Sequence, residues 1–196
     1  DVSSLSDDEL SEIRNQEIGF IFQGFNLIQN LTALENVELP LIYRNVPAAE
    51  RKRLSEESLK RVGLEKRMDH KPTEMSGGQQ QRVAIARTLA PEPQVLFMDE
   101  PLSNLDAKLR LEMRYELQRL HVETGSTFVY VTHDQMEAMT LATKICLINN
   151  GVLQQYEPPL SVYSRPNNLF VADFVGNPSI NFIEAKGEQN AQGNIE

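Results

Sequence analysis

Apolar and polar residues alternate along this chain with two different periods, and the order of these periods predicts the fold. Apolar, β-favouring runs, where strands are expected, lie at 18–22, 94–98 and 126–132. Segments with the helical spacing of apolar residues cover 79–90, 107–123 and 135–142. Strands and helices therefore alternate, which indicates parallel strands with crossover helices and an α/β fold. The apolar run at 94–98 predicts a buried strand.

Two short helices are expected near the front of the chain, because two segments match the capping box. In this motif a serine or threonine and a glutamate three residues later satisfy free backbone groups at a helix start. Ser6 with Glu9, and Thr32 with Glu35, have this spacing. A charged amphipathic segment at 48–62 predicts a further helix on the surface.

The pattern changes after Lys144. Two apolar runs flank Asn149-Asn150-Gly151, and this arrangement predicts a β-hairpin. Cys146 lies in the first of these runs and is expected to be a buried, inert thiol; as the one cysteine of the chain it excludes an internal disulfide. Residues 1–176 are expected to form one domain, and residues 177–196 to begin a second β-domain without completing it.

Composition and charge narrow the range of functions. The chain has 196 residues and a net charge of −9, which argues against a general nucleic-acid-binding protein, because phosphate contacts need a basic surface. Its apolar runs are far shorter than the roughly 20 residues that a membrane-spanning helix needs. We therefore expect a cytosolic protein whose membrane role comes through a partner.

Two carboxylates directly follow the strand expected at 94–98. Asp99 and Glu100 would lie at the carboxyl edge of the sheet, where open α/β sheets bind ligands. Asp99 could hold Mg²⁺ on a nucleotide triphosphate, and Glu100 could orient and deprotonate an attacking water. Taken alone, Asp99-Glu100-Pro101 also fits the simple start of a loop.

A serine and two glycines open the helix expected at 79–90. Ser76, Gly77, Gly78 and Gln79 place a hydroxyl and unhindered backbone N–H groups at the positive end of this helix, which suits a phosphate. Taken alone, they also fit a simple serine cap with flexible glycines.

His133 follows the strand expected at 126–132. It could donate to a γ-phosphate, although a lone histidine is more often structural. Asp134 comes next and has Glu137 three residues later, a spacing that predicts a helix cap.

The order of these features is more informative than any one of them. Gln23 follows the first expected strand, and then come MSGGQ at 75–79, VLFMDEP at 95–101, SNLD at 103–106 and His133. With these motifs in this order, the chain resembles the nucleotide-binding subunits of ABC transporters over nearly all of residues 1–176. The resemblance implies a P-loop NTPase-like ABC ATPase domain, with a parallel core sheet and a helical subdomain at about 25–75.

The resemblance implies roles for the residues at the sheet edge. Asp99 matches the Walker B aspartate, Glu100 the catalytic glutamate and His133 the switch histidine. Gln23 matches the Q-loop glutamine that contacts Mg²⁺ and couples to the membrane subunit. ATP and Mg²⁺ are therefore the expected substrate and cofactor.

Other matches imply a dimer. Ser76, Gly77, Gly78 and Gln79 correspond to the signature loop, with Met75 in place of the usual leucine, and Asp106 closes the D-loop. In this family two subunits bind ATP head to tail, and the signature loop of one faces the phosphates held by the other. The expected partners are a second ATPase subunit and transmembrane permease subunits at the inner face of the cell membrane.

Two parts of the chain resemble different branches of the family. Residues 1–41 look like lipoprotein-release and macrolide-export ATPases. From about Pro91 onward the chain is similar to carbohydrate-importer ATPases that carry a C-terminal regulatory β-domain. Import and export therefore both stay open, and the transported substrate is not encoded in such a subunit.

The glycine-rich phosphate loop is missing, since no G-x-x-x-x-G-K-[ST] occurs in the chain. The family places this loop before the segment that begins here, so we expect a truncated front, poor ATP binding and no hydrolysis by the chain alone. We also expect apolar sheet surface to be left exposed. The alternatives are a soluble ABC ATPase in translation or DNA repair, which would need a second cassette or a long coiled-coil insertion, and a non-catalytic fragment.

Overall fold

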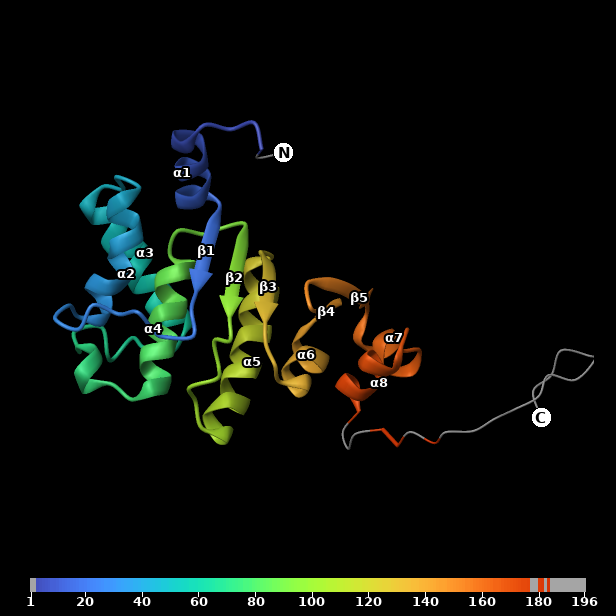
Figure 1. Ribbon diagram of the computed structural model, residues 1–196. Helices are drawn as coiled ribbons and strands as arrows, with labels where there is room; N and C mark the ends of the chain where they lie inside the picture. Colours follow the sequence, from blue (N-terminus) through green and yellow to red (C-terminus); the bar gives the residue numbers. More distant parts are fainter. Residues whose placement is uncertain (1–2, 177–179, 182, 184–196) are drawn as a thin grey trace, which may run out of the picture. The chain divides into compact units, whose positions relative to one another are not determined.

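The computed structural model describes residues 3–176, 180, 181 and 183 (Figure 1). The chain divides into two compact units, 1–137 and 138–196, each of which is described by itself. The second β-domain expected at 177–196 lies almost entirely outside the described residues. Within the described part, no helix has the length and apolar character needed to cross a membrane.

A parallel sheet of three strands is the centre of the first unit. The strands are, in order across the sheet, β1 (Ile18–Ile21), β2 (Val95–Asp99) and β3 (Thr127–Val131) (Figure 1). The main helices around them are α4 (Gly77–Leu89) and α5 (Ala107–Thr124); α6 (Gln135–Leu141) follows β3 and continues into the second unit. Since α4 precedes β2 and α5 joins β2 to β3, the predicted α/β alternation is confirmed.

Local capping starts two of the helices. In α1 (Asp7–Gln16) the Glu9 carboxylate lies 2.8 Å from the Ser6 backbone nitrogen, and in α2 (Ala33–Tyr43) the Glu35 carboxylate lies 2.7 Å from that of Thr32. These backbone hydrogen bonds lower the pKa of both glutamates, because they favour the charged carboxylate. Both predicted capping boxes are confirmed.

Three helices pack together beside the sheet. They are α2, α3 (Ala48–Arg61) and α4, and their buried apolar residues include Val37, Leu41, Leu59, Val83 and Ile85. A short 3₁₀ helix, Pro72–Glu74, leads into α4.

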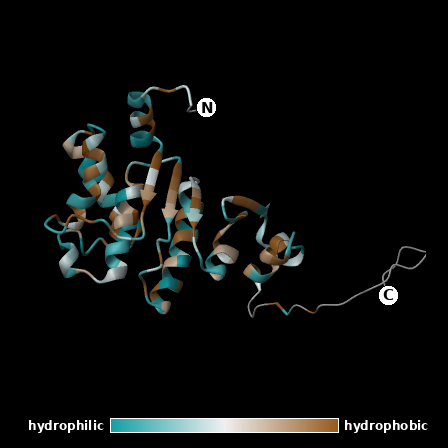
Figure 2. Cartoon of the chain, viewed as in Figure 1, coloured by the Kyte–Doolittle hydropathy of each residue, from teal (hydrophilic) through white to brown (hydrophobic). Residues whose placement is uncertain are grey.

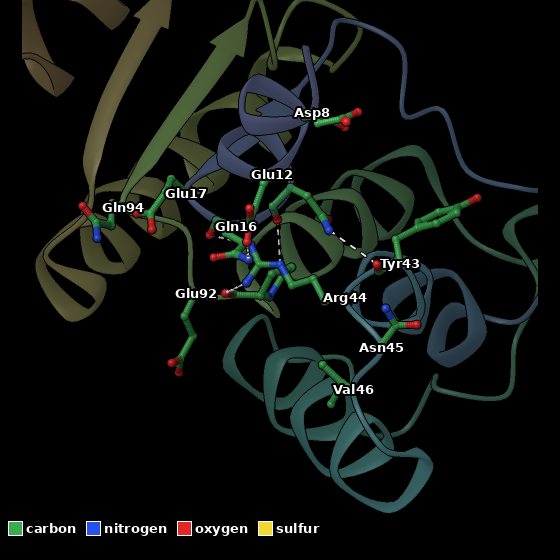
Figure 3. A pocket seen from close by; sticks show the side chains of 13 residues that line it. Asp8, Glu12, Gln16, Glu17, Tyr43, Arg44, Asn45, Val46, Glu92 and Gln94 are labelled. Atoms are coloured by element: carbon green, nitrogen blue, oxygen red, sulfur yellow. Dashed lines mark hydrogen bonds between the residues drawn. The ribbon is translucent and has the colours of Figure 1, made fainter. Parts of the chain in front are cut away.

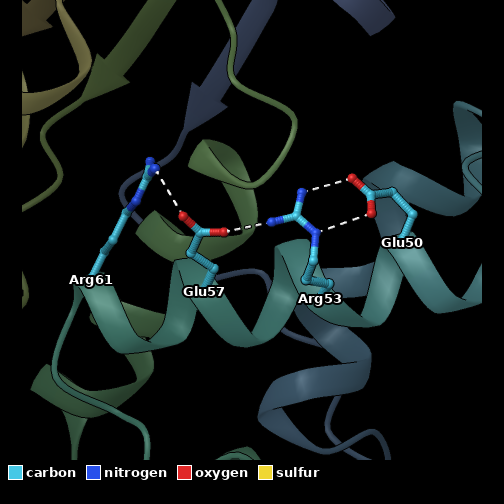
Figure 4. A network of polar contacts seen from close by, with 4 residues as sticks. All are labelled: Glu50, Arg53, Glu57 and Arg61. Atoms are coloured by element: carbon cyan, nitrogen blue, oxygen red, sulfur yellow. Dashed lines mark hydrogen bonds and ion pairs between the residues drawn. The ribbon is translucent and has the colours of Figure 1, made fainter.

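The outer face of α3 is charged. Arg53 lies 2.7 Å from Glu50 and 3.1 Å from Glu57, and Arg61 lies 3.5 Å from Glu57 (Figure 4). Pairs this exposed add little stability, because water competes for both partners. They do keep this face solvated, so the predicted surface helix is confirmed.

The two faces of the sheet differ. Leu96 and Met98 on β2 are buried in the same apolar core as residues of α4 and α5. On the other face Phe20, Phe97 and Val129 lie in register and are 44%, 37% and 41% exposed. Figure 2 shows that β2 is apolar along most of its length. The expected exposed apolar surface is therefore present.

This arrangement corrects the prediction of a buried strand at 94–98. The strand is buried on one face and accessible on the other, because the core of this unit gathers on the face of Leu96 and Met98. An apolar run predicts a strand well, but it does not tell whether both faces are covered.

The second unit begins with the predicted hairpin. β4 (Ile145–Asn149) pairs antiparallel with β5 (Val152–Glu157). Asn150 and Gly151 have φ angles of 49° and 77°, in the left-handed region that a two-residue hairpin turn requires. Helices α7 (Pro159–Ser164) and α8 (Leu169–Val175) follow, and the core of this unit contains Ile145, Leu147, Val162, Val171 and Val175.

Cys146 is exposed, so the prediction of a buried thiol is wrong. Ile145 and Leu147 on either side of it are buried. Because side chains alternate between the faces of a strand, Cys146 points to the other face.

Candidate functional site

The predicted site residues converge at one edge of the parallel sheet. Asp99 is the last residue of β2, and Glu100 follows it. Gln23 lies two residues after the end of β1, and His133 two residues after the end of β3. Because the three strands are parallel and neighbouring, all four residues lie at the carboxyl edge, where ligands bind in open α/β sheets.

Glu100 and His133 contact each other directly. The Nε2 atom of His133 lies 2.7 Å from Oε1 of Glu100. The His133 side chain is 87% exposed, whereas that of Glu100 is 26% exposed. The imidazole can therefore reach a ligand in solvent while a carboxylate orients its ring.

The backbone at Glu100 is in an unusual conformation. Its φ of 43° lies in the left-handed region, which costs a residue with a side chain of order 1–3 kcal/mol. The Glu100 N–H donates to the Val131 carbonyl at 3.0 Å, and its own carbonyl accepts from the Ser103 hydroxyl at 2.8 Å. These bonds to β3 and to the following loop hold the strained conformation.

The loop after β1 is held from two directions. Asn104 donates to the Gln23 carbonyl at 2.9 Å. On α4, Arg87 donates to the carbonyls of Asn26 at 2.6 Å and Phe25 at 3.2 Å. Burial lowers the pKa of Arg87, because it disfavours the charged guanidinium. The Gln23 side chain is exposed, so its backbone is fixed while its amide is free to meet a ligand.

The start of α4 has the predicted cap. The Ser76 hydroxyl accepts from the Gln79 N–H at 3.4 Å, and the Gln79 side chain accepts from the Ser76 N–H at 3.0 Å. Ser76 and Gly77 are exposed, whereas Gly78 is buried. In the described part of the chain, no hydrogen bond joins this helix start to Glu100 or His133. The structure therefore gives two separate groups of candidate residues.

Asp106 belongs to neither group. It caps α5, since its Oδ1 accepts from the Leu109 N–H at 2.9 Å, and it is exposed.

Sequence reasoning missed the polar network behind His133. Tyr130 and Thr132 donate to the buried Glu137 carboxylate at 2.9 Å and 2.8 Å. The predicted cap is present, because Asp134 Oδ1 accepts from the Glu137 N–H at 3.1 Å. Arg110 on α5 lies 3.6 Å from Asp134. The alternation of β3 could have indicated that Tyr130 and Thr132 share a face, but nothing local points to Arg110.

An open recess of about 1060 Å³ lies around Arg44, and its rim carries Asp8, Glu12, Glu17 and Glu92 (Figure 3). The Arg44 guanidinium donates to the carbonyls of Asn15, Gln16 and Pro91. It therefore ties the end of α1 to the loop before β2. Because Glu17 and Gln94 of its lining directly precede β1 and β2, this recess lies at the opposite end of the strands from Glu100.

Comparison with solved structures gives close matches. A dimeric post-hydrolysis state of the ATP-binding cassette MJ0796, bound to ADP and Pi, has a TM-score of 0.68 and 45% identity, covering 80% of this chain and 68% of that one. A dimeric structure of the bacterial ABC transporter cassette MJ0796 gives the same TM-score and identity.

Curated proteins with similar sequences include import ATP-binding proteins. The trehalose/maltose import ATP-binding protein MalK of Thermococcus litoralis is 47% identical over 172 residues, which are 88% of this chain and 46% of MalK. The oligosaccharides import ATP-binding protein MsmX of Bacillus subtilis is 44% identical over 173 residues, 88% of this chain and 47% of MsmX. The chain thus spans about half the length of the curated relatives it matches.

A family model gives the assignment. The model described as "ABC transporter" matches residues 2–103, which is more than half of the chain. The parallel sheet and its alternation with helices agree with this match. The chain therefore belongs to the ABC transporter family and has the α/β fold of its ATPase cassettes.

Proposed function

We propose that the chain is part of the ATP-hydrolysing subunit of an ABC importer, and that residues 1–176 are its ATPase domain. The single observation that carries this proposal is the 2.7 Å contact between Glu100 and His133 beside Asp99, at the carboxyl edge of the sheet. The import function of relatives such as MalK and MsmX supports the direction of transport.

Glu100 is the proposed general base of this site. Its carboxylate would accept a proton from the water that attacks the γ-phosphate, which becomes inorganic phosphate as the bond to ADP breaks. The His133 imidazole is the proposed donor to a γ-phosphate oxygen, and its Nε2 would exchange the contact with Glu100 for this bond when ATP binds. The strained backbone of Glu100 supports its role as general base, because it fixes the position of this carboxylate before substrate binds.

Asp99 and Gln23 are the proposed ligands for Mg²⁺. A carboxylate and an amide oxygen at one exposed sheet edge fit a hard cation that prefers oxygen ligands and keeps several waters. When bound, the ion would neutralise charge on the phosphates. The residues of the chain then have to place and activate the water.

A second copy of the subunit is the proposed partner at the start of α4. Ser76, Gly77, Gly78 and Gln79 would contact the phosphates bound by the other copy, and Asp106 would lie at the same interface. The exposed hydroxyl at the positive end of a 13-residue helix favours an anion there. The dimeric structures of the MJ0796 cassette support a second ATPase subunit as the partner.

The other proposed partners are transmembrane permease subunits. The subunit would bind them at the inner face of the membrane through the helices at about 25–75, and residues 177–196 would begin a regulatory β-domain. A nucleic-acid partner is not proposed, given the net charge of −9. The resemblance of residues 1–41 to export ATPases is kept as a proposal for the part of this docking region that they cover.

The 196 residues alone are proposed to be inactive. They contain no G-x-x-x-x-G-K-[ST] motif. The residues named above would supply a general base, ligands for Mg²⁺ and the helix start that contacts the phosphates of the other copy, but not a phosphate-binding loop.

Phosphate release by the complete subunit tests the proposal. Glu100→Gln keeps the shape of the side chain but removes the base, and it should lower kcat by about 10²- to 10⁴-fold while ATP binding persists. Glu92→Gln is the matched control, because Glu92 also has a positive φ, 52°, but lies in the loop before β2. Full activity in Glu100→Gln, or an equal loss in Glu92→Gln, would overturn the assignment.

A further inference from the structure

One arginine on α5 bridges two loops of the site. These loops are the SNLD segment, Ser103 to Asp106, and the turn that carries His133. The Arg110 Nη2 donates to the Leu105 carbonyl at 3.2 Å, and its Nη1 lies 3.6 Å from Oδ2 of Asp134. Both side chains of this ion pair are about one-third exposed, so solvent screens it less than a fully exposed pair.

The turn that Arg110 contacts is itself firmly held. The Asp134 N–H donates to the Thr132 hydroxyl at 3.0 Å, and the other Asp134 oxygen accepts from the Glu137 N–H at 3.1 Å. The Thr132 hydroxyl donates to the Glu137 carboxylate at 2.8 Å, and Glu137 is only 3% exposed. Both neighbours of His133 are therefore anchored to Glu137, Thr132 through the buried carboxylate and Asp134 through the backbone N–H.

His133 has little packing of its own. Its side chain is 87% exposed, and within the part of the chain that the structure describes its polar contact is with Glu100. The place of the imidazole is consequently set by the backbone between Thr132 and Asp134. A force on Asp134 would move the ring relative to Glu100.

We propose that Arg110 is a positioning residue that couples the SNLD segment to His133. A displacement of the Leu105 carbonyl pulls on the guanidinium, which pulls on Asp134 and thereby shifts the imidazole. This inference rests on the proposed function, since it matters for ATP hydrolysis only if His133 meets the γ-phosphate. By this route, a movement at the proposed subunit interface near Asp106 would change the position of His133 at the carboxyl edge of the sheet.

Kinetics in the complete subunit test the coupling. Arg110→Met keeps the aliphatic stem, and Asp134→Asn keeps the acceptor for the Glu137 N–H; each should lower kcat about tenfold by misplacing the imidazole. The KM for ATP should change less than about twofold, because neither side chain binds substrate. Arg119→Met, on the same helix but paired with Glu116 and Glu123, is the matched control and should leave kcat unchanged.

A double-mutant cycle separates positioning from general stability. In a His133→Ala background, Arg110→Met should lower kcat by less than about twofold, because the residue through which it acts is gone. A loss of the same size in both backgrounds, or no loss in the wild-type background, would overturn the proposal.

A second readout does not need ATP. The chain has three histidines, so ¹³C-labelled histidine resolves the His133 ring by NMR. Arg110→Met should broaden or split this resonance, whereas Arg119→Met should not. If the wild-type subunit fails to hydrolyse ATP, the proposed function is wrong, and the NMR result still decides the coupling. An unchanged His133 resonance in Arg110→Met would refute it.

Discussion

At the scale of single residues, backbone strain and side-chain contacts have to be considered together. Glu92 and Glu100 both have positive φ angles, 52° and 43°, in a region that residues with a side chain usually avoid. Glu92 is exposed at the rim of the recess around Arg44, whereas Glu100 lies 2.7 Å from His133. Strain alone therefore does not mark a functional residue, and the contact with His133 distinguishes Glu100.

The two glycines of α4 give a prediction at this scale. A methyl group at Gly78 would lie 2.5 Å from the Leu109 side chain, whereas one at Gly77 would have only an ordinary contact, 3.8 Å from Phe25. Gly78→Ala should lower the free energy of unfolding by about 1–3 kcal/mol through overpacking against α5. Urea unfolding of the purified protein measures this change.

Gly77→Ala is the control for this prediction, and it should be neutral or slightly stabilising because alanine favours a helix. Leu109→Ala should restore much of the stability lost in Gly78→Ala by removing the clash. Equal stabilities for Gly77→Ala and Gly78→Ala would contradict the packing seen here. The sequence presents both glycines as equivalent parts of one loop. What separates them is Leu109, which only the folded chain brings close.

At the scale of elements, a buried hydrogen-bond network joins β3 to α6. Tyr130 donates to Glu137 at 2.9 Å. Burial raises the pKa of Tyr130 far above its ordinary value of 10.0, and the neighbouring Glu137 charge raises it further, because both disfavour the phenolate. The folded protein therefore keeps the Tyr130 proton at a pH where the unfolded chain has released it.

Because the folded protein keeps the Tyr130 proton, the direction in which its stability changes at alkaline pH can be predicted. Above pH 10.0 the unfolded chain binds fewer protons than the folded one, so stability falls as the pH rises. One such group lowers the free energy of unfolding by about 1.4 kcal/mol per pH unit. Tyr130→Phe removes the group, and its stability should fall less steeply between about pH 10 and 11.5. The free energy of unfolding is measured by urea unfolding at several pH values in this range. If it fell with the same slope in both proteins, the burial of the phenol would be contradicted.

How far the elements could be predicted depends on the range of the interactions that form them. Capping boxes at Ser6 and Thr32 involve residues three positions apart, so the sequence predicts them correctly. The Gln23, Asp99 and His133 positions were predictable because parallel strands bring their carboxyl ends to one edge. Arg110 could not be predicted in the same way, since its contact with Asp134 depends on how α5 packs beside β3.

At the scale of the whole first unit, one face of the sheet is uncovered, as expected for its apolar surface, although the strand predicted at 94–98 was expected to be buried. Phe20 stacks on Phe97, with ring centroids 5.4 Å apart, and on Phe22, at 6.0 Å. Val129 and Val131 of β3 are 41% and 52% exposed. Contiguous apolar residues of this kind bind other apolar surfaces readily, unlike the scattered single ones found on most proteins. Hydrophobic periodicity predicts which residues belong to the strand, but the number of layers depends on the rest of the unit.

The exposed face predicts that the 196-residue chain binds the dye ANS and self-associates. Replacing Phe20 and Val129 together by threonine places a strand-favouring β-branched residue at both positions and removes apolar surface. It should lower ANS fluorescence by about half and shift sedimentation toward the monomer. Val122→Thr on α5 is the control, because Val122 is 81% exposed but lies away from the stacked rings. If the double variant and the control bound the same amount of dye as the unmodified chain, the association would have to arise from another surface. A lower signal in the double variant alone would locate it on the sheet, because both replaced side chains point to its uncovered face.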